Sequence, residues 1–310
     1  MQKIVISEFM DQEAVDFLAA QFDTIYDPSL VKDPARLMEL VRDADALIVR
    51  NATQVRGELL DAGVNLKAIG RLGVGLDNID CSACRARNIE VLPATGANDV
   101  SVAEYVIAGV LMLLRGSYFS TDAVRNGKWP RNALIGREAE GTTLGLVGFG
   151  NIARHVARRA VALGIRVIAF DPNMAPHHPA WSDHSVTSVS LADLLATADA
   201  ISLHVPLVES TRNLIDAAAI ETMKDGAVLI NTARGGVIDD AAVAGALITG
   251  KLGGAMIDVF PQEPLPVENP YHGVPNLILT PHIAGVTNES NVRVSAVTAE
   301  NVMRVLAARA

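Results

Sequence analysis

The sequence predicts an α/β fold with two domains, each built on a parallel sheet. Three observations predict this class. Short apolar runs alternate with longer stretches of helical periodicity along the whole chain. The chain has 310 residues, which is enough for two hydrophobic cores. Hydrophobic residues make up 50% and charged residues only 20%, a composition typical of a folded protein rather than a disordered one.

The first part of the chain contains five apolar runs separated by segments of helical pattern. The predicted strands are Lys3–Ser7, Thr24–Tyr26, Ala46–Val49, Lys67–Ile69 and Glu90–Leu92. The predicted helices are Gln12–Gln21, Pro34–Val41, Arg56–Ala62 and Asp80–Arg87. Asp11 and Asp33 precede two of these helices and suit N-caps, and Pro34 suits a first helical position.

The middle of the chain predicts one long, mostly apolar helix at Asp99–Phe119, followed by a polar, turn-rich loop at 125–131. The alternation of strands and helices then restarts. The predicted strands are Thr143–Val147, Arg166–Phe170, Ala200–His204, Ala227–Asn231, Gly254–Val259 and Leu277–Thr280. The predicted helices are Asn151–Leu163, Leu191–Thr197, Asp216–Met223 and Asp239–Ile248.

The last segment, Asn288–Arg309, predicts a helix that packs back on the first domain. The first domain is therefore expected to be discontinuous. It would comprise residues 1–98 and 285–310, around a central domain at 99–284.

The charge of the chain bears on its partners. The formal net charge is −9, and an acidic surface repels nucleic acid and anionic membrane, so neither is an expected partner. The sequence contains no run of 18 apolar residues, so it predicts no membrane span. The segment Met1–Ser7 has the pattern of a strand rather than of a signal peptide. We therefore expect a cytoplasmic protein.

Two cysteines, Cys81 and Cys84, form a C-x-x-C motif. Such a motif can mark a redox site or half of a zinc site. No second cysteine pair completes a zinc site, and no thioredoxin-like context surrounds the motif. We therefore interpret the pair as two small residues on one face of a helix and expect no metal.

A glycine-rich turn follows the predicted strand Thr143–Val147, with the pattern G-x-G-x-x-A at Gly148, Gly150 and Ala153. Gly148 permits a tight turn, Gly150 lets the backbone approach a pyrophosphate, and Ala153 keeps helix and strand close. The helix that begins near Asn151 offers N–H groups and its positive dipole end to phosphates. The turn predicts a Rossmann-type dinucleotide-binding domain.

Asp171 ends the next predicted strand, 21 residues after Gly150. A carboxylate at this position binds the ribose 2′-OH and disfavours a 2′-phosphate, so NAD is favoured over NADP. The alternative is a structural glycine turn with a surface aspartate, which the strand–turn–helix order disfavours.

Three later strand ends carry Arg234, Glu263 and His282. In open α/β sheets, groups at the carboxyl ends of strands line the ligand crevice. A histidine can take the hydroxyl proton of a carbinol, a carboxylate can orient that histidine, and a guanidinium can hold a 2-keto acid. Singly, these could be a surface ion pair, a loop carboxylate and a capped loop histidine. Their joint position near a dinucleotide turn favours catalysis.

Several segments resemble the D-isomer-specific 2-hydroxyacid dehydrogenase family, most of all its D-3-phosphoglycerate dehydrogenases. The segments are Gly70–Asp80, 145–153, Asn231–Val237, Ala255–Glu263 and Pro281–Val286. The resemblance implies two Rossmann-like domains with an active-site cleft between them, NAD as the cofactor, and catalytic roles for Arg234, Glu263 and His282. Besides the turn glycines Gly148 and Gly150, it implies cofactor contacts at Asn151, Ile152, Asp171, His204, Val205, Pro206, Thr232, Ala233, Asp258, Ala284 and Gly285.

For the substrate, the resemblance implies that the backbone N–H groups of Val74 and Gly75 bind a carboxylate as an anion nest. Arg50 and Asn51 would lie nearby, and Arg234 and His282 would complete the substrate site. Asn51 departs from the small hydroxyl residue that phosphoglycerate enzymes usually carry, so the distal group of the substrate stays open. The chain ends at residue 310, so no appended regulatory domain is expected.

The family also implies a homodimer, for which the apolar segment 99–119 is a candidate contact, although that segment could instead be buried between the domains. Arg131 is a candidate to reach the site of a partner subunit.

The predicted activity is NAD-dependent interconversion of a small anionic 2-hydroxy acid and its 2-keto acid by hydride transfer. Phosphoglycerate, sulfolactate, glycerate and simpler hydroxy acids are all compatible. Formate dehydrogenases resemble this fold but carry glutamine in place of Glu263. An alternative of another class is an NAD(H)-sensing module like the transcriptional corepressors built on this scaffold, which keep the three catalytic residues. Turnover of 2-keto acids separates the enzyme from the sensor.

Overall fold

Both parts of the chain form parallel sheets covered by helices, as the fold class predicts. The computed structural model describes residues 1–309, which divide into two units. Unit 1 comprises Met1–Asn98 and the C-terminal segment from Val286. Unit 2 comprises Asp99–Gly285.

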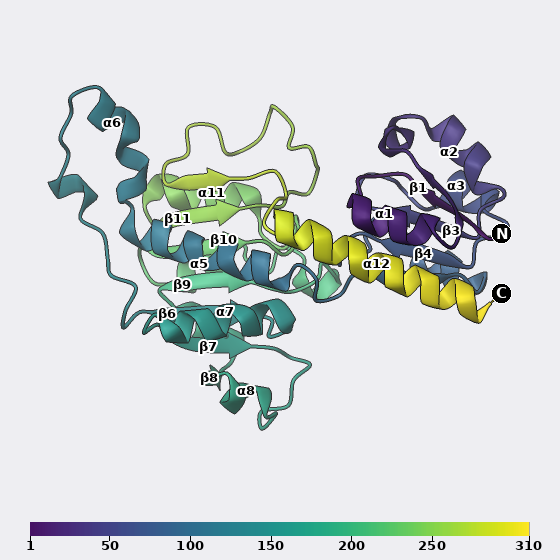
Figure 1. Ribbon diagram of the computed structural model, residues 1–310. Coiled ribbons are helices and arrows are strands. Elements are labelled where there is room, and N and C mark those ends of the chain that lie inside the picture. The colour runs from purple at the N-terminus through teal and green to yellow at the C-terminus, as the bar shows by residue number, and fades with distance from the viewer. Residues whose placement is uncertain (310) are drawn as a thin grey trace. The chain divides into compact units, whose positions relative to one another are not determined.

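Unit 1 has a five-stranded parallel sheet in the order β2-β1-β3-β4-β5 (Figure 1). Its strands are β1 Lys3–Ile6, β2 Asp23–Tyr26, β3 Ala46–Val49, β4 Ala68–Arg71 and β5 Glu90–Pro93. Its helices are α1 Gln12–Ala19, α2 Pro34–Val41, α3 Gly57–Ala62, α4 Cys81–Ala86 and α12 Asn288–Ala308, with a 3-10 helix at Pro28–Lys32. Asp11 and Asp33 cap α1 and α2 through their side chains, and Pro34 is the first residue of α2, as predicted.

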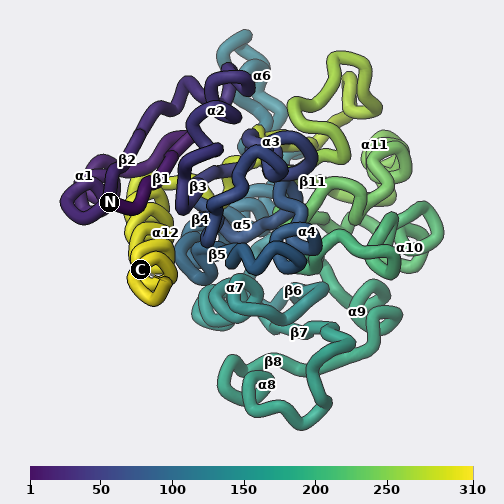
Figure 2. Tube along the Cα trace, turned by 90° about the vertical axis from the view of Figure 1, so that its right-hand side faces the viewer, coloured from purple at the N-terminus to yellow at the C-terminus, as the bar shows by residue number. Residues whose placement is uncertain are grey.

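Alternate residues of the central strands in unit 1 face two cores. Ile4, Ile6 and Ile48 pack in one core with Val302 of α12, whereas Val5 and Leu47 pack in the other core, against α2 and α3. The sequences of these strands are therefore continuously apolar, because helices cover both faces of the sheet. Helices α1 and α12 lie side by side on one face (Figures 1 and 2).

Unit 2 has a seven-stranded parallel sheet in the order β12-β11-β10-β9-β6-β7-β8. Its strands are β6 Thr143–Val147, β7 Arg166–Phe170, β8 Val186–Ser188, β9 Ala200–Leu203, β10 Ala227–Asn231, β11 Leu252–Ile257 and β12 Leu277–Leu279. Its helices are α5 Asp99–Arg115, α6 Thr121–Arg125, α7 Asn151–Ala162, α8 Ala180–Asp183, α9 Leu191–Thr197, α10 Ala217–Thr222 and α11 Asp240–Thr249. Three short 3-10 helices lie at Ser117–Ser120, Asn132–Leu134 and Glu209–Thr211.

The strand order of unit 2 reverses between β6 and β9. After β8 the chain returns to place β9 on the other side of β6. Such a reversal opens a crevice at the carboxyl ends of the two strands, which is where ligands bind in doubly wound sheets. The glycine turn predicted from the sequence directly follows β6 and therefore lies at this crevice.

The prediction of one helix over Asp99–Phe119 is wrong at its C-terminal end. Helix α5 stops at Arg115, because Gly116 adopts a left-handed conformation with φ of 65°. The chain continues as a short 3-10 helix and as α6, which the sequence analysis missed, as it missed β8 and α8. Strand β11 begins two residues before the predicted Gly254.

Among residues 1–309, no single helix is long and apolar enough to cross a membrane. Helix α5 and the segment Ser117–Arg125 meet the length and composition criteria only together, and they are bent by 67° relative to each other.

Candidate active site

The glycine turn after β6 has the geometry that a dinucleotide site requires. Gly148 has φ of +92°, and a Cβ there would lie 2.5 Å from the carbonyl oxygen of His204, so only glycine fits. Gly150 is the N-cap of α7 and makes no side-chain cap hydrogen bond. A Cβ built at Gly150 would meet no atom within 4 Å. The space at the start of α7 is therefore open, and the N–H groups of its first turn, with Asn151 and Ile152, suit a phosphate group.

Asp171 follows β7 and is fixed beside this turn. Its Oδ2 accepts a hydrogen bond of 2.9 Å from the backbone N–H of Phe149, and its Oδ1 accepts one of 2.9 Å from Asn173. Each carboxylate oxygen retains a further lone pair for a ribose hydroxyl. The turn, the open helix end and this carboxylate together fit NAD.

The side chain of Phe149 anchors the glycine turn in the core of unit 2. It is fully buried and stacks on Trp181 with a ring-centroid separation of 4.7 Å. His184 lies edge-on to the same ring. Burial, reinforced by the charge of Arg154, lowers the pKa of His184. Sequence reasoning missed this support, because nothing in the pattern around Trp181 pairs it with Phe149.

Other predicted cofactor residues lie at the ends of β9, which pairs with β6, and of β10, which pairs with β9. His204, Val205 and Pro206 follow β9, whereas Thr232 and Ala233 follow β10. Burial lowers the pKa of His204 to about 4. The Nε2 atom of His204 lies 3.0 Å from the hydroxyl of Ser202.

His282 and Glu263 form a hydrogen-bonded pair. Nδ1 of His282 lies 2.7 Å from Oε2 of Glu263, and Oε1 of Glu263 accepts a 3.0 Å bond from the N–H of Phe260. Burial alone would raise the pKa of Glu263, but the bonds from His282 and Phe260 and the charge of Arg234 outweigh it and lower the pKa. The bond uses Nδ1 of the imidazole and therefore leaves Nε2 for proton transfer.

Arg234 lies in a loop after β10 that Asn231 shapes. The side chain of Asn231 accepts a bond from the N–H of Ala233 and donates one to the carbonyl of Arg234. A Cβ at Gly235 would lie 1.9 Å from the carbonyl carbon of Phe260, so glycine is required there. This contact brings the Arg234 loop against the backbone that leads to Glu263.

Asp258, predicted as a cofactor contact, is 1% exposed and binds the segment that carries His282. Its carboxylate accepts bonds from the hydroxyl of Thr280 at 2.6 Å and from the N–H groups of Ile283 and Ala284 at 2.8 and 2.9 Å. The predicted residues Ala284 and Gly285 end this segment. The structure thus gives Asp258 a role within the chain that sequence reasoning did not assign.

In unit 1, the loop with Arg50 and Asn51 is held by Glu8. The buried carboxylate of Glu8 accepts bonds from the N–H groups of Arg50, Ala52 and Thr53. The guanidinium of Arg50 donates to Oδ1 of Asn291 at 2.8 Å. Burial lowers the pKa of Arg50, partly offset by the charge of Glu8. Sequence reasoning missed Glu8, which lies 42 residues before Arg50.

The predicted anion nest at Val74 and Gly75 is built around Arg71. The buried guanidinium of Arg71 donates to the carbonyls of Leu72 and Gly75, both at 2.7 Å. The loop thereby turns these two carbonyls toward Arg71. Within residues 1–309, the backbone N–H groups of Val74 and Gly75 make no hydrogen bond to the protein, which leaves them available to an anion.

Asn98 is a further residue that the sequence analysis did not single out. In the part of the chain that the structure describes, its Oδ1 is the one buried side-chain polar atom without a hydrogen-bond partner. A buried carbonyl oxygen without a donor is costly, so this atom is a candidate to accept a bond from a ligand.

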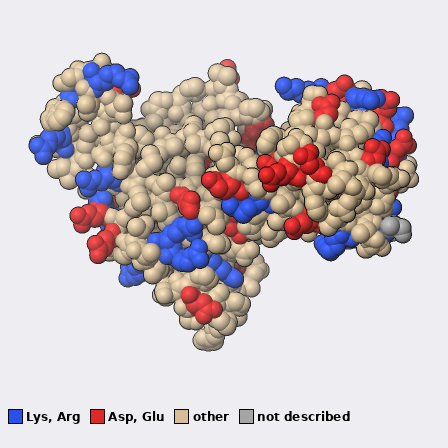
Figure 3. All heavy atoms as spheres, in the orientation of Figure 1, with Lys and Arg blue, Asp and Glu red and all other residues tan. Residues whose placement is uncertain are grey.

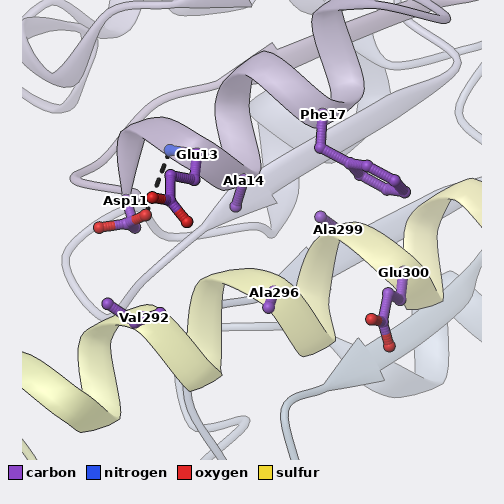
Figure 4. Close-up of a pocket in the computed structure, with 8 residues that line it drawn as sticks. All are labelled: Asp11, Glu13, Ala14, Phe17, Val292, Ala296, Ala299 and Glu300. Carbon is purple, nitrogen blue, oxygen red and sulfur yellow. Dashed lines mark hydrogen bonds between the residues drawn. The ribbon is translucent and has the colours of Figure 1, made fainter.

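Unit 1 has a hollow between α1 and α12 (Figure 4). Its lining residues are Asp11, Glu13, Ala14, Phe17, Val292, Ala296, Ala299 and Glu300. Acidic side chains gather over these two helices on the face drawn in Figure 3. None of the predicted site residues lines the hollow, and we assign it no role.

A glycine turn at the switch point of a parallel sheet and a histidine–glutamate pair at later strand ends define a nicotinamide-dependent oxidoreductase. The family model described as the NAD-binding domain of D-isomer specific 2-hydroxyacid dehydrogenases matches residues 107–284. The chain belongs to the D-isomer-specific 2-hydroxyacid dehydrogenase family and is an NAD-dependent 2-hydroxyacid dehydrogenase.

Individual relatives that the chain resembles are named as dehydrogenases or reductases. The chain is 55% identical to "(S)-sulfolactate dehydrogenase" of Chromohalobacter salexigens over 100% of both chains. It is 39% identical to "Hydroxypyruvate reductase" of Thermotoga maritima over 98% of each chain. It is 37% identical to "D-3-phosphoglycerate dehydrogenase" of Archaeoglobus fulgidus, covering 98% of this chain but 57% of that protein. The D-lactate dehydrogenase of Aquifex aeolicus, solved with NAD and lactic acid, has a TM-score of 0.86 at 29% identity, with 99% and 96% of the two chains covered.

Proposed function

We propose that this dehydrogenase interconverts a D-2-hydroxy acid that carries a second anionic group, with sulfolactate as the preferred member, and the corresponding 2-keto acid. The observation that carries the proposal is the sequence identity of 55%, over the full length of both chains, with a protein named as a sulfolactate dehydrogenase. The partly buried Arg50, whose guanidinium donates to Asn291, supports it, because a fixed guanidinium suits a sulfonate or phosphate group.

The stereochemistry of sulfolactate agrees with the family. Sulfur gives the sulfomethyl group priority over the carboxylate, so the (S) label of sulfolactate describes the same handedness as a D-2-hydroxy acid. The name of the relative from Chromohalobacter salexigens is thus consistent with a D-specific site.

For catalysis, His282 takes the hydroxyl proton of the substrate at Nε2 and returns it to the keto oxygen in the reverse direction. Glu263, bonded to Nδ1, fixes the tautomer and stabilises the imidazolium that forms. Arg234 binds the substrate carboxylate and polarises the keto group. NAD, bound at the glycine turn, supplies the hydride acceptor.

For substrate binding, the N–H groups of Val74 and Gly75 hold the carboxylate, and Arg50 holds the second anionic group. Asn51 is exposed beside Arg50 and is the residue that would adapt the site to a group other than phosphate. The buried Oδ1 of Asn98 accepts a hydrogen bond from the bound ligand.

We also propose a homodimer that forms through the segment after α5. This segment carries exposed large apolar side chains at Tyr118, Phe119, Val124, Trp129 and Ile135. Such a concentration marks a surface that another protein covers, and a second copy of the chain is the occupant that the family suggests. Arg131 lies in this segment and would approach the partner's site. The cytoplasmic location and the lack of nucleic-acid and membrane partners stay predictions from composition.

The experiment that tests the substrate is a comparison of kcat/KM with NADH across 3-sulfopyruvate, 3-phosphohydroxypyruvate, hydroxypyruvate and pyruvate. We expect the highest value with 3-sulfopyruvate. The variant Arg50→Gln should lower kcat/KM for 3-sulfopyruvate by about 10- to 100-fold, the range for losing a charge-assisted hydrogen bond, and should affect pyruvate little. A preference for hydroxypyruvate or pyruvate in the unmodified enzyme would refute the second anionic group. Tight NADH binding without turnover of any keto acid would favour a sensing role.

A further inference from the structure

A partly buried chain of polar side chains in unit 2 joins helix α5 to the segment that carries His282. Oη of Tyr105, on α5, lies 2.5 Å from Oγ1 of Thr280. Oγ1 of Thr280 lies 2.6 Å from Oδ1 of Asp258, which follows β11. These three side chains form a continuous chain of hydrogen bonds, which we call the Tyr105 relay.

The direction of the Tyr105 relay follows from the chemistry of its ends. The carboxylate of Asp258 accepts N–H groups from two backbone positions and therefore acts as an acceptor. Thr280 must then donate its own proton to Asp258 and accept the proton of Tyr105. Burial raises the pKa of Tyr105 to about 12, so the phenol remains a donor at neutral pH.

The far end of the Tyr105 relay holds the backbone around His282. The N–H groups of Ile283 and Ala284 donate to the Asp258 carboxylate, and the N–H of His282 donates to the carbonyl of Asp258 at 2.8 Å. His282 itself has φ of 53°, a left-handed conformation that a residue with a Cβ adopts only when its surroundings impose it. The bonds to Asp258 supply that constraint.

We propose that Tyr105 and Thr280 are positioning residues for His282, acting through Asp258 on the backbone of residues 282–284. Neither residue is placed against the substrate. The proposal rests on the proposed role of His282. It assigns a function to Tyr105, which belongs neither to the glycine turn nor to the three proposed catalytic residues.

The geometry sets the expected effects of substitution. Thr280→Val keeps the size of the side chain but leaves the Tyr105 hydroxyl and Asp258 Oδ1 without their bond. The displaced loop should lower kcat by about 10- to 100-fold, as small displacements of a catalytic group do. Thr280→Ser retains the hydroxyl and should restore most of kcat. Tyr105→Phe removes only the outer donor and should give a smaller fall in the same direction.

The test measures loop order independently of turnover. Hydrogen–deuterium exchange of the full chain, without substrate or cofactor, reports on the amides of His282, Ile283 and Ala284. We expect faster exchange there in Thr280→Val and Tyr105→Phe, and wild-type protection in Thr280→Ser. The matched control is Tyr271→Phe, which removes the hydroxyl of another tyrosine of the same unit, bonded at 2.6 Å to Asp240. It should leave these amides unchanged.

Faster exchange at 282–284 with a lower kcat, both rescued by Thr280→Ser, supports the proposal. Unchanged exchange in both Thr280→Val and Tyr105→Phe overturns it, as does faster exchange with unaltered kcat. An equal effect of Tyr271→Phe on these amides also overturns it. If Thr280→Val does not fold, Tyr105→Phe supplies the same comparison. A wild-type enzyme that reduces no keto acid refutes the proposed function instead. The hydrogen–deuterium exchange result still tests whether Tyr105 and Thr280 order residues 282–284, because it does not depend on turnover.

Discussion

Nδ1 of His282 lies 2.7 Å from the carboxylate of Glu263, although the two residues belong to loops after different strands of the sheet. The second oxygen of Glu263 is bonded to the N–H of Phe260, so the carboxylate cannot rotate freely. A histidine held in this way presents its other nitrogen in one orientation. The catalytic assignment of the pair rests on this arrangement.

The first prediction concerns Glu263→Gln. Glutamine keeps the shape of the side chain but removes the charge that stabilises an imidazolium at His282. We expect kcat to fall by about 10²- to 10⁴-fold, the usual contribution of an acid–base group, with little change in thermal stability. The measurement is steady-state NADH oxidation with a saturating keto acid. Glu268→Gln, an exposed change in the same loop, is the control and should keep wild-type kcat. Equal activity of the two variants would contradict the role of Glu263.

The second prediction concerns Gly235→Ala. The added Cβ would lie 1.9 Å from the carbonyl carbon of Phe260, which is backbone and cannot move aside as a flexible side chain can. Separation of the Arg234 loop from the Glu263 backbone should lower kcat/KM at least about tenfold and destabilise the chain by about 1–3 kcal/mol. Gly245→Ala is the matched control, because a Cβ there meets nothing within 4 Å. Chemical denaturation and initial rates check both variants, and a Gly235→Ala enzyme as stable and active as Gly245→Ala would refute the close contact.

The third prediction concerns pH and His204. Burial lowers the pKa of His204 from 6.5 to about 4 in the folded chain. Between about pH 6.5 and 4, His204 is therefore protonated in the unfolded chain but neutral in the folded chain. The free energy of unfolding consequently falls as the pH falls through this range. The expected contribution is up to about 3 kcal/mol at pH 4.

Unfolding free energies at several pH values test this. Between pH 6.5 and 4.5, His204→Gln should show a shallower loss of stability than the wild type. The exposed change His177→Gln should retain the wild-type slope. Parallel pH profiles for wild type and His204→Gln would rule out a lowered pKa at His204.

The sequence predicted the parts of the site that depend on chain order. Strands of a parallel sheet place their carboxyl ends together, so the strand pattern could predict that Gly148, Asp171, Arg234 and Glu263 follow strand ends at one edge of the sheet, whereas their roles stay predictions from the glycine motif, residue chemistry and the family resemblance. The end of α5 was misplaced because the apolar pattern continues past Gly116, whereas the left-handed conformation of that glycine ends the helix.

The supporting residues could not be predicted in this way. Glu8 holds a loop 42 residues further along the chain, and Tyr105 bonds a threonine 175 residues away. Such pairings depend on how helices and strands pack, and no local pattern encodes them. Asp258 shows the same effect, because the family resemblance implied a cofactor contact there, whereas its side chain accepts hydrogen bonds from the backbone of the His282 segment.

The central claim is that His282 transfers the proton in this dehydrogenase, and single-turnover NADH oxidation tests it most directly. Enzyme loaded with NADH is mixed with 3-sulfopyruvate for the wild type, His282→Asn and the exposed control His177→Asn. We predict that His282→Asn binds NADH with a Kd close to that of the wild type and reacts about 10²- to 10⁴-fold more slowly, while His177→Asn reacts at the wild-type rate. A His282→Asn enzyme that oxidises NADH at the wild-type rate would contradict the claim.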